Sequence, residues 1–193
     1  DASTLFNLQN NKSFAIPAVE NVFTSVEIYQ NKIYVGSKNG LHVLNQLSGK
    51  FEILNNRNSA LLSNDIHVVY ADSKNRLWIG TEKGEVRVEN DEWKTYHDGK
   101  KISHVYENRE GLWFISLDEK TKKQEMWLID HFNREYDAGF GPDLYRGTFN
   151  DFCIDSKGKL YFASDAFIRY DPYEEKTKNF TEMAGLLSSK CTS

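Results

Sequence analysis

Apolar and polar residues alternate along most of the chain in short runs, which is the pattern of β-strands whose side chains point alternately to two faces. The clearest run is LWIGT at 77–81, and related runs stand at 33–37 (IYVGS), 112–116 (LWFIS) and 160–164 (LYFAS). Each run follows another alternating segment and a polar turn, and two further strand-like segments come after it. The pattern therefore predicts a unit of four strands that occurs four times.

The four related runs begin at residues 33, 77, 112 and 160, so successive runs are 44, 35 and 48 residues apart. Internal repeats with periods of 20–50 residues signal solenoids, propellers or arrays, and four strands per unit are typical of a propeller blade. Neither face of the predicted sheets is polar, as expected for a blade packed between two neighbours. We therefore predict an all-β chain of β-propeller blades, each a four-stranded antiparallel meander.

The repeat also sets approximate boundaries within a single propeller domain or propeller fragment that spans 1–193. The predicted blades cover about 22–60, 61–98, 99–140 and 141–185, with a partial blade at 1–21 and the start of another at 186–193. Either the two ends pair to complete a shared blade or, as we favour, the chain is a piece of a larger propeller. An open ring exposes unpaired edges, so we expect self-association or association with the remainder of a larger propeller.

One position of the repeat is expected to control the spacing between sheets. A small residue stands fourth in the second strand at Gly36, Gly80 and Ala163, where it would let the adjacent sheet approach closely. Ile115 breaks this rule in the third unit. The tryptophans of the predicted strands, Trp78, Trp113 and Trp127, are expected in the core rather than on a ligand platform, whereas Trp93 opens an outermost strand.

Acidic residues recur five positions before the second strand, at Asp72, Glu107 and Asp155. An active site is normally unique, so a residue that recurs once per unit is better explained as part of a turn. The five histidines are scattered, and none stands at i, i+2 or i, i+4 from another. No phosphate-binding loop, nucleophile elbow or H-E-x-x-H motif is present. We therefore predict no catalytic residues, no metal site and no cofactor.

Composition and charge narrow the classes of partner. The chain has 13% aromatic residues, a formal net charge of −4, and no basic run that alternates with aromatics, so nucleic acid is not an expected partner. No apolar stretch approaches the roughly 20 residues that a membrane helix needs, so we expect no membrane insertion in this segment. The two cysteines, Cys153 and Cys191, form no disulfide framework.

The segment LLSNDIHVVYADSKNRLWIGTEKGEVRVEND (61–91) resembles the two-component regulator propeller repeat. The matching residues are Leu62, Ser63, Asn64, Asp72, Leu77, Trp78, Ile79, Gly80, Thr81, Gly84 and Arg87. The resemblance extends over about 22–193, although the other units are degenerate copies in which Tyr34 and Tyr161 replace the Trp.

Propellers of this family form the periplasmic part of sensor histidine kinases, often hybrid ones that regulate glycan use. The resemblance thus implies a non-enzymatic, extracytoplasmic sensor or ligand-binding module of a two-component signalling protein. Its expected ligand is an oligosaccharide or another small molecule. The parent protein would be anchored in the inner membrane, and any kinase activity would reside in a segment beyond this chain.

Loops that depart from the repeat are the best candidates for a binding site, because blade architecture alone does not explain them. Two such loops belong to the third unit: the expanded connection at 117–125 and the link at 137–149. In a propeller both emerge on the same face, so we expect them to be neighbours. The predicted ligand-binding residues are Asp118, Lys120, Phe140, Asp143, Tyr145 and Arg146. Alternatively, Phe140 and Tyr145 plug the seam between blades.

Two other functions remain open from the sequence. The propeller could be a scaffold for protein–protein association that binds no small molecule. It could also be a propeller glycoside hydrolase or lyase, since carboxylates are plentiful and one sequence does not reveal which of them lie at catalytic spacing.

Overall fold

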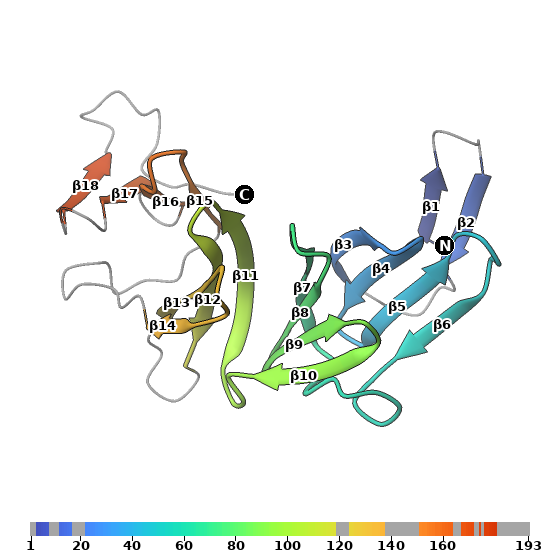
Figure 1. The fold of residues 1–193 in the computed structure, drawn as a ribbon. Coiled ribbons are helices and arrows are strands. Elements are labelled where there is room, and N and C mark those ends of the chain that lie inside the picture. The colour runs from blue at the N-terminus through green and yellow to red at the C-terminus, as the bar shows by residue number, and fades with distance from the viewer. Residues whose placement is uncertain are drawn as a thin grey trace.

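The computed structural model describes residues 22–118, 124–137, 151–163, 167–171, 174 and 176–180, together with the backbone of 3–7 and 12–16. Every helix or strand in this part of the chain is a β-strand (Figure 1), which confirms the predicted all-β class. The described residues accordingly contain no helix of the length and hydrophobicity needed to cross a membrane.

The strands form four sheets of four and one hairpin, listed here in chain order. The first sheet holds β3 (Phe23–Tyr29), β4 (Lys32–Ser37), β5 (Gly40–Asn45) and β6 (Phe51–Leu54). The second holds β7 (Ile66–Ala71), β8 (Leu77–Thr81), β9 (Gly84–Glu89) and β10 (Glu92–Tyr96). The third holds β11 (Lys101–Asn108), β12 (Gly111–Leu117), β13 (Gln124–Asp130) and β14 (Glu135–Asp137). The fourth holds β15 (Asp151–Ile154), β16 (Leu160–Ala163), β17 (Phe167–Asp171) and β18 (Lys176–Phe180). The hairpin pairs β1 (Ser3–Asn7) with β2 (Lys12–Ile16).

Within each sheet the strands follow their order in the sequence and all pairs are antiparallel, so each sheet is a meander of the predicted kind. The sheets succeed one another in space as they do in the chain, with the first on the right and the fourth on the left of Figure 1. The first strands of successive sheets, β3, β7, β11 and β15, contact one another in turn. This is the arrangement of propeller blades around an axis.

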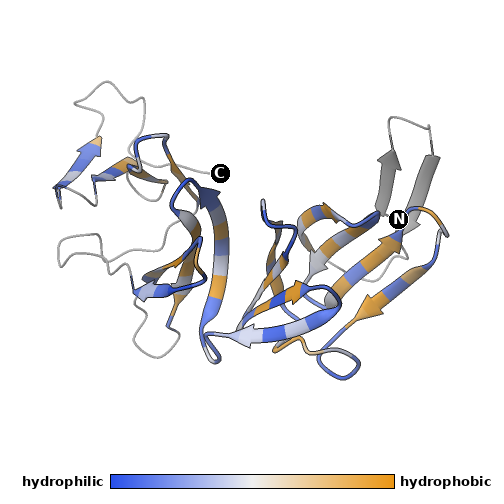
Figure 2. Cartoon of the chain, viewed as in Figure 1, coloured by the Kyte–Doolittle hydropathy of each residue, from blue (hydrophilic) through white to orange (hydrophobic). Residues whose placement is uncertain are grey.

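A layer of apolar side chains fills each gap between neighbouring sheets. Leu41 and Val43 of the first sheet pack with Leu77 and Ile79 of the second. Trp78, which is fully buried, packs against Phe114 of the third sheet with the ring centroids 5.0 Å apart. Burial of Trp78 and Trp113 confirms that these indoles belong to the core. In Figure 2, strand β5 is mainly hydrophobic and the outermost strand β18 mainly hydrophilic, as a blade with a wet outer edge requires.

The small residue in the second strand does bring sheets together. A Cβ atom added to Gly36 would lie 2.8 Å from Ile66 Cγ2, and one added to Gly80 would lie 2.9 Å from Ile102 Cγ2. Ile66 and Ile102 belong to the first strand of the following sheet, so the prediction is confirmed at both glycines. Ile115, which replaces the glycine in the third sheet, is fully buried in the layer shared with the fourth.

The repeated acidic position is a turn residue in two units and was assigned to the wrong residue in the third. Asp72 and Asp155 each accept hydrogen bonds from the backbone N–H groups two and four residues further on. In the third unit Asn108 accepts the corresponding turn bonds, because the turn there is one residue shorter. Glu107 instead accepts two hydrogen bonds from Ser73, in the turn of the preceding sheet.

Candidate functional site

Of the six predicted ligand-binding residues, Asp118 lies within the described part of the chain, directly after β12 and half-buried. Lys120, Phe140, Asp143, Tyr145 and Arg146 lie outside the described residues, so the proposed neighbourhood of the two loops stays a prediction. One boundary was wrong. Ser116 pairs with Glu125 and Leu117 with Gln124, so the connection between β12 and β13 comprises 118–123 rather than 117–125.

One face of the second sheet gathers the turn between β8 and β9 together with both links to its neighbours. The Glu82 N–H donates to the Asp65 carbonyl in the incoming link (3.0 Å), and the Gly99 N–H in the outgoing link donates to the Lys83 carbonyl (3.1 Å). Lys100 of the outgoing link pairs with Glu125 at the start of β13. We call the surface formed by 65–67, 82–83, 97–101, Asp118 and Glu125 the link face.

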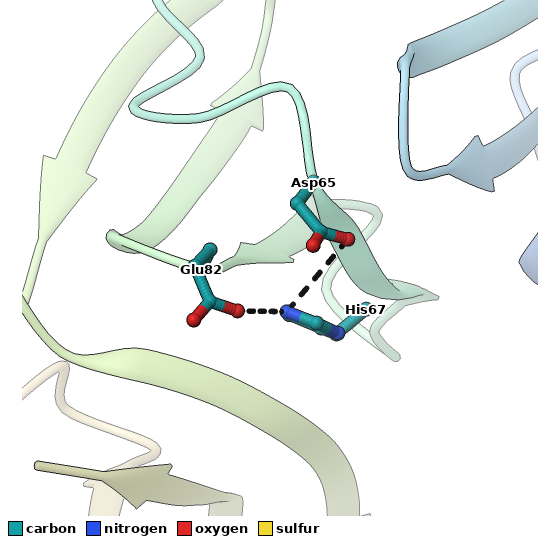
Figure 3. Close-up of side chains that lie close together, drawn as sticks. All are labelled: Asp65, His67 and Glu82. Carbon is teal, nitrogen blue, oxygen red and sulfur yellow. Dashed lines mark hydrogen bonds and ion pairs between the residues drawn. The ribbon is translucent and has the colours of Figure 1, made fainter. Parts of the chain in front are cut away.

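A histidine and two carboxylates meet on the link face (Figure 3). His67 Nε2 lies 2.7 Å from Glu82 Oε2 and 4.0 Å from Asp65 Oδ1. His67 reaches Glu82 because it is the extra residue of a β-bulge between Ile66 and Val68, and a bulge re-aims a side chain out of the regular alternation. His67 belongs to β7, Asp65 directly precedes that strand, and Glu82 lies in the β8–β9 turn. No simple spacing in the sequence therefore indicates the cluster.

Charge within this cluster is partly balanced by Lys101, whose Nζ lies 3.3 Å from Glu82 Oε2. Burial alone would raise the pKa of Glu82, but hydrogen bonds from His67 and Lys101 outweigh it and lower that pKa. Asp65 Oδ1 is buried and accepts no hydrogen bond from the described residues. One imidazole nitrogen and two carboxylate oxygens within 4.8 Å of one another are a donor set that fits a divalent metal, and as arranged here they form an ion-pair network with Lys101.

A second histidine on the link face joins the second sheet to the third. The side chain of His97 is only 6% exposed; its Nδ1 lies 2.5 Å from Glu85 Oε1 in β9, and its Nε2 lies 2.9 Å from Glu135 Oε1 in β14. Desolvation acts to lower the pKa of His97, but the hydrogen bonds and charges of Glu85 and Glu135 outweigh it and raise that pKa above 6.5. His97 therefore bridges the two sheets through one carboxylate on each, an arrangement that favours the charged imidazolium, and we call it the charged clamp.

Trp127 differs from the other strand tryptophans. Its indole is half-buried and contacts both the His97 ring, with centroids 4.7 Å apart, and the Lys100 ammonium, 4.3 Å from the indole centroid. The prediction that Trp127 belongs to the core is confirmed in part: the indole packs against the core between the second and third sheets, and it also lines the link face, where it makes a cation–π contact with Lys100. A residue at a strand position can be core in one sheet and surface in the next because the neighbouring sheet covers it to a different extent.

The hairpin of β9 and β10 carries a shallow concavity of about 420 Å³, away from the link face. It is lined by Arg87, Glu89, Asn90, Glu92, Trp93 and Lys94. Trp93 is half-buried, as its place at the start of an outermost strand suggested, and packs against the core between the first and second sheets. Arg87 is ion-paired with Glu89, so the charges that line this concavity largely compensate one another.

Comparison with known proteins gives one match to a protein family and several solved structures of similar fold. Residues 60–83 match the family model described as the two-component regulator propeller. The matched segment therefore resembles a single two-component regulator propeller repeat. It contains Asp72, Trp78 and Gly80, the residues that form the turn, the core and the close approach in the second sheet. The resemblance noted in the sequence is thereby confirmed for this unit. A search of curated proteins gives no significant match.

Solved structures similar to the chain include extracellular domains of B. thetaiotaomicron proteins, one described as a one-component system and two as hybrid two-component systems. The TM-scores are 0.74, 0.72 and 0.70 at sequence identities of 13%, 14% and 17%. Each comparison covers 98% of this chain and only 26%, 26% and 27% of the other. The chain thus spans about a quarter of these structures, and the likeness establishes its propeller fold.

Proposed function

We propose that the chain is a non-enzymatic sensor or ligand-binding module that lies outside the cytoplasm and belongs to a two-component signalling protein. The observation that carries this proposal is the regulator-type repeat at 60–83, combined with a fold likeness over 98% of the chain to extracellular domains of hybrid two-component systems. Kinase activity and a membrane anchor would belong to other segments of that protein.

The link face is the recognition surface that the structure supports best. It offers carboxylates, two histidines and two lysines, paired with one another in charge, and the indole of Trp127. An aromatic face flanked by hydrogen-bonding groups suits an oligosaccharide, because sugar rings present both C–H surfaces and hydroxyls. Asp118 stands on the same face, at the start of the loop that contains the predicted binding residue Lys120.

A thermal-shift screen against a panel of oligosaccharides tests the proposal. We expect a saturable rise in Tm with at least one glycan, because a ligand that binds only the folded state stabilises it by mass action. The rise should disappear in the double variant Tyr145→Ala, Arg146→Ala. The matched control is Tyr136→Ala, Arg134→Ala, which removes the same residue types around Asp130, at the opposite end of β13 from Glu125, and should leave the ligand-induced shift intact.

The same screen separates the alternatives. A shift that survives in the Tyr145→Ala, Arg146→Ala variant would contradict the predicted role of the link at 137–149, and turnover of a screened glycan would contradict the non-enzymatic assignment. Failure of every glycan would favour the scaffold function. That second candidate has its own support in the structure, since Val26 and Ile28 of the first sheet are 59% and 60% exposed.

A further inference from the structure

The side chains of Asp65, His67 and Glu82 converge at the spacing of ligands around a metal ion (Figure 3). His67 Nε2 lies 2.7 Å from Glu82 Oε2 and 4.0 Å from Asp65 Oδ1. In a tetrahedral site with metal–ligand distances of about 2.0–2.2 Å, neighbouring ligand atoms are roughly 3.3–3.6 Å apart. The two observed distances lie on either side of this range, so small side-chain rotations place the three groups around one ion.

Asp65 brings an acceptor to this cluster that nothing else in the described part of the chain uses. Its Oδ1 atom is buried and accepts no hydrogen bond there, although the side chain as a whole is 33% exposed. A buried carboxylate oxygen without a donor is costly, and a bound ion is one way to satisfy it. At 4.0 Å, His67 Nε2 is too far away to donate to this oxygen. An ion between Asp65 and His67 supplies the missing partner.

The same three backbone positions carry other residue types in the neighbouring sheets. In the first sheet, the residues that correspond by register to Asp65, His67 and Glu82 are Val22, Thr24 and Lys38. In the third sheet they are Lys101, Ser103 and Leu117. Neither set contains an imidazole or a carboxylate. Blade architecture therefore does not require such groups at these positions, and their joint occurrence beside the links of the second sheet points to a ligand.

The mixture of donor atoms selects the class of ion. Imidazole nitrogen combined with carboxylate oxygen suits Zn²⁺ and the neighbouring first-row transition ions. Ca²⁺ takes about 6–8 oxygen ligands and Mg²⁺ demands an octahedral oxygen set, so neither matches a cluster built around an imidazole. The two carboxylates balance the charge of a divalent ion when His67 is neutral. Without an ion, the Lys101 ammonium, 3.3 Å from Glu82 Oε2, supplies positive charge to the cluster.

We propose that Asp65, His67 and Glu82 bind a divalent transition ion of the Zn²⁺ class, with the fourth coordination position open to water. Binding releases the proton that lies between His67 Nε2 and Glu82, and it displaces the Lys101 ammonium from Glu82. The ion joins the incoming link, β7 and the β8–β9 turn. The sequence predicted no metal site because its histidines lack regular spacing, but these ligands come from three separate segments.

Isothermal titration calorimetry of the untagged full chain with Zn²⁺ tests the site. The background variant is Cys153→Ser, Cys191→Ser, so that thiolates do not compete for the ion. We expect binding that saturates at one ion per chain. Asp65→Asn and His67→Gln should each weaken it by more than the roughly 10–100-fold that the loss of an outer-shell partner costs. Circular dichroism melts confirm that each variant folds.

The matched control is His104→Gln, which removes a half-buried histidine of β11 whose Nε2 lies 3.9 Å from a single carboxylate, that of Asp151, and it should leave Zn²⁺ binding unchanged.

Two further measurements separate a metal site from a simple ion-pair network. Lys101→Gln should tighten Zn²⁺ binding about three- to tenfold, because it removes the cation that competes for Glu82. Ca²⁺ in place of Zn²⁺ should give no saturable signal. Zn²⁺ is the only ligand added, so the outcome does not depend on oligosaccharide binding.

The proposal is overturned if no saturable binding occurs up to millimolar Zn²⁺. It is also overturned if binding survives Asp65→Asn and His67→Gln, since the ion then lies elsewhere. Unchanged affinity in Lys101→Gln would contradict the displacement of the ammonium.

Discussion

The second and third sheets have a tryptophan at the same register position, but the indole N–H group has a different hydrogen-bond acceptor in each. In the second sheet, Asp72 Oδ2 accepts hydrogen bonds from Trp78 Nε1 (2.8 Å) and from Arg76 Nε (2.6 Å). In the third sheet, Trp113 Nε1 donates a hydrogen bond to Asn108 Oδ1 (3.2 Å). Asp72 and Arg76 are almost completely buried, so the second sheet contains an ion pair where the third contains a neutral amide.

The difference shows how one turn can also secure its neighbour. Arg76 donates to Asn133 Oδ1 in the third sheet (2.6 Å), and its guanidinium lies 5.3 Å from the centroid of the Trp78 ring. The charged network therefore ties the second sheet to the third, whereas the bonds that Asn108 accepts come from its own turn and from Trp113. The unit closest to the family repeat is thus the one whose turn is part of a contact between sheets.

Removing the acceptor in each sheet should give the largest contrast. Asp72→Ala leaves Arg76 as a buried charge without its partner, which costs about 3–5 kcal/mol of the free energy of unfolding. Asn108→Ala removes neutral hydrogen bonds and should cost about 1–2 kcal/mol. Urea denaturation at neutral pH measures both. Equal losses for the two variants would contradict the distinct role assigned to the buried ion pair.

The charged clamp at His97 should give the two sheets a pH-dependent junction. Because its folded-state pKa is raised above 6.5, the clamp stabilises the fold fully at pH values below about 6.5 and loses this contribution as the pH rises through the folded-state value. The substitution His97→Asn removes the clamp but tolerates the left-handed φ of 44° at this position.

At pH 6 we expect His97→Asn to cost about 1.5–3 kcal/mol, the net size of a hydrogen bond to a charged group. The difference between wild type and variant should shrink as the pH is raised toward 9. Denaturation at a series of pH values gives the comparison, and the groups that face His97, namely Glu85, Glu135, Trp127 and Lys100, are unchanged in the variant. A difference that is constant with pH would show that the imidazole is not charged in the folded protein.

Substitution at the spacing position should destabilise both sheets, but for opposite reasons. A methyl group added by Gly80→Ala would lie 2.6 Å from Val68 Cγ1 and 3.0 Å from the Ile102 carbonyl oxygen, so we expect overpacking to cost about 1–3 kcal/mol. At the equivalent Ile115, the loss of a methyl in Ile115→Val leaves a small cavity and should cost about 0.5–1.5 kcal/mol. Thermal unfolding measures both. A neutral Gly80→Ala would indicate that the third sheet can move away at little cost.

Most of the architecture could be predicted from the sequence because a propeller repeats local information. Alternation marks each strand, and the recurrence of Trp78 and Gly80 equivalents marks the sheet contacts. The prediction of the turn residue was wrong where the repeat changes length. Counting back five residues from the second strand gives Glu107, but the third turn has lost one residue, so the turn is closed by Asn108.

The polar clusters around His97 and His67 could not be predicted from the sequence, for a different reason. His97 meets Glu85 and Glu135 from two sheets, at separations of 12 and 38 residues, and no spacing rule covers such pairs. His67 finds Glu82 because a bulge turns its side chain, and bulges have no reliable signature in an isolated strand. The sequence did offer one indication: both histidines lie next to the links between sheets, and connecting segments often carry binding residues.

The bulge at His67 has counterparts at Thr24 in β3 and Ser103 in β11, each at the same point of a first strand. These three side chains lie outside the strict alternation that assigns every other residue to one packed face. Their contacts differ from sheet to sheet: Thr24 Oγ1 donates to the Ile66 carbonyl of the second sheet (2.7 Å), whereas His67 pairs with Glu82 in the β8–β9 turn of its own sheet. A hydroxyl, an imidazole and a second hydroxyl occupy these positions, so one backbone irregularity that recurs in three sheets presents a different chemical group in each.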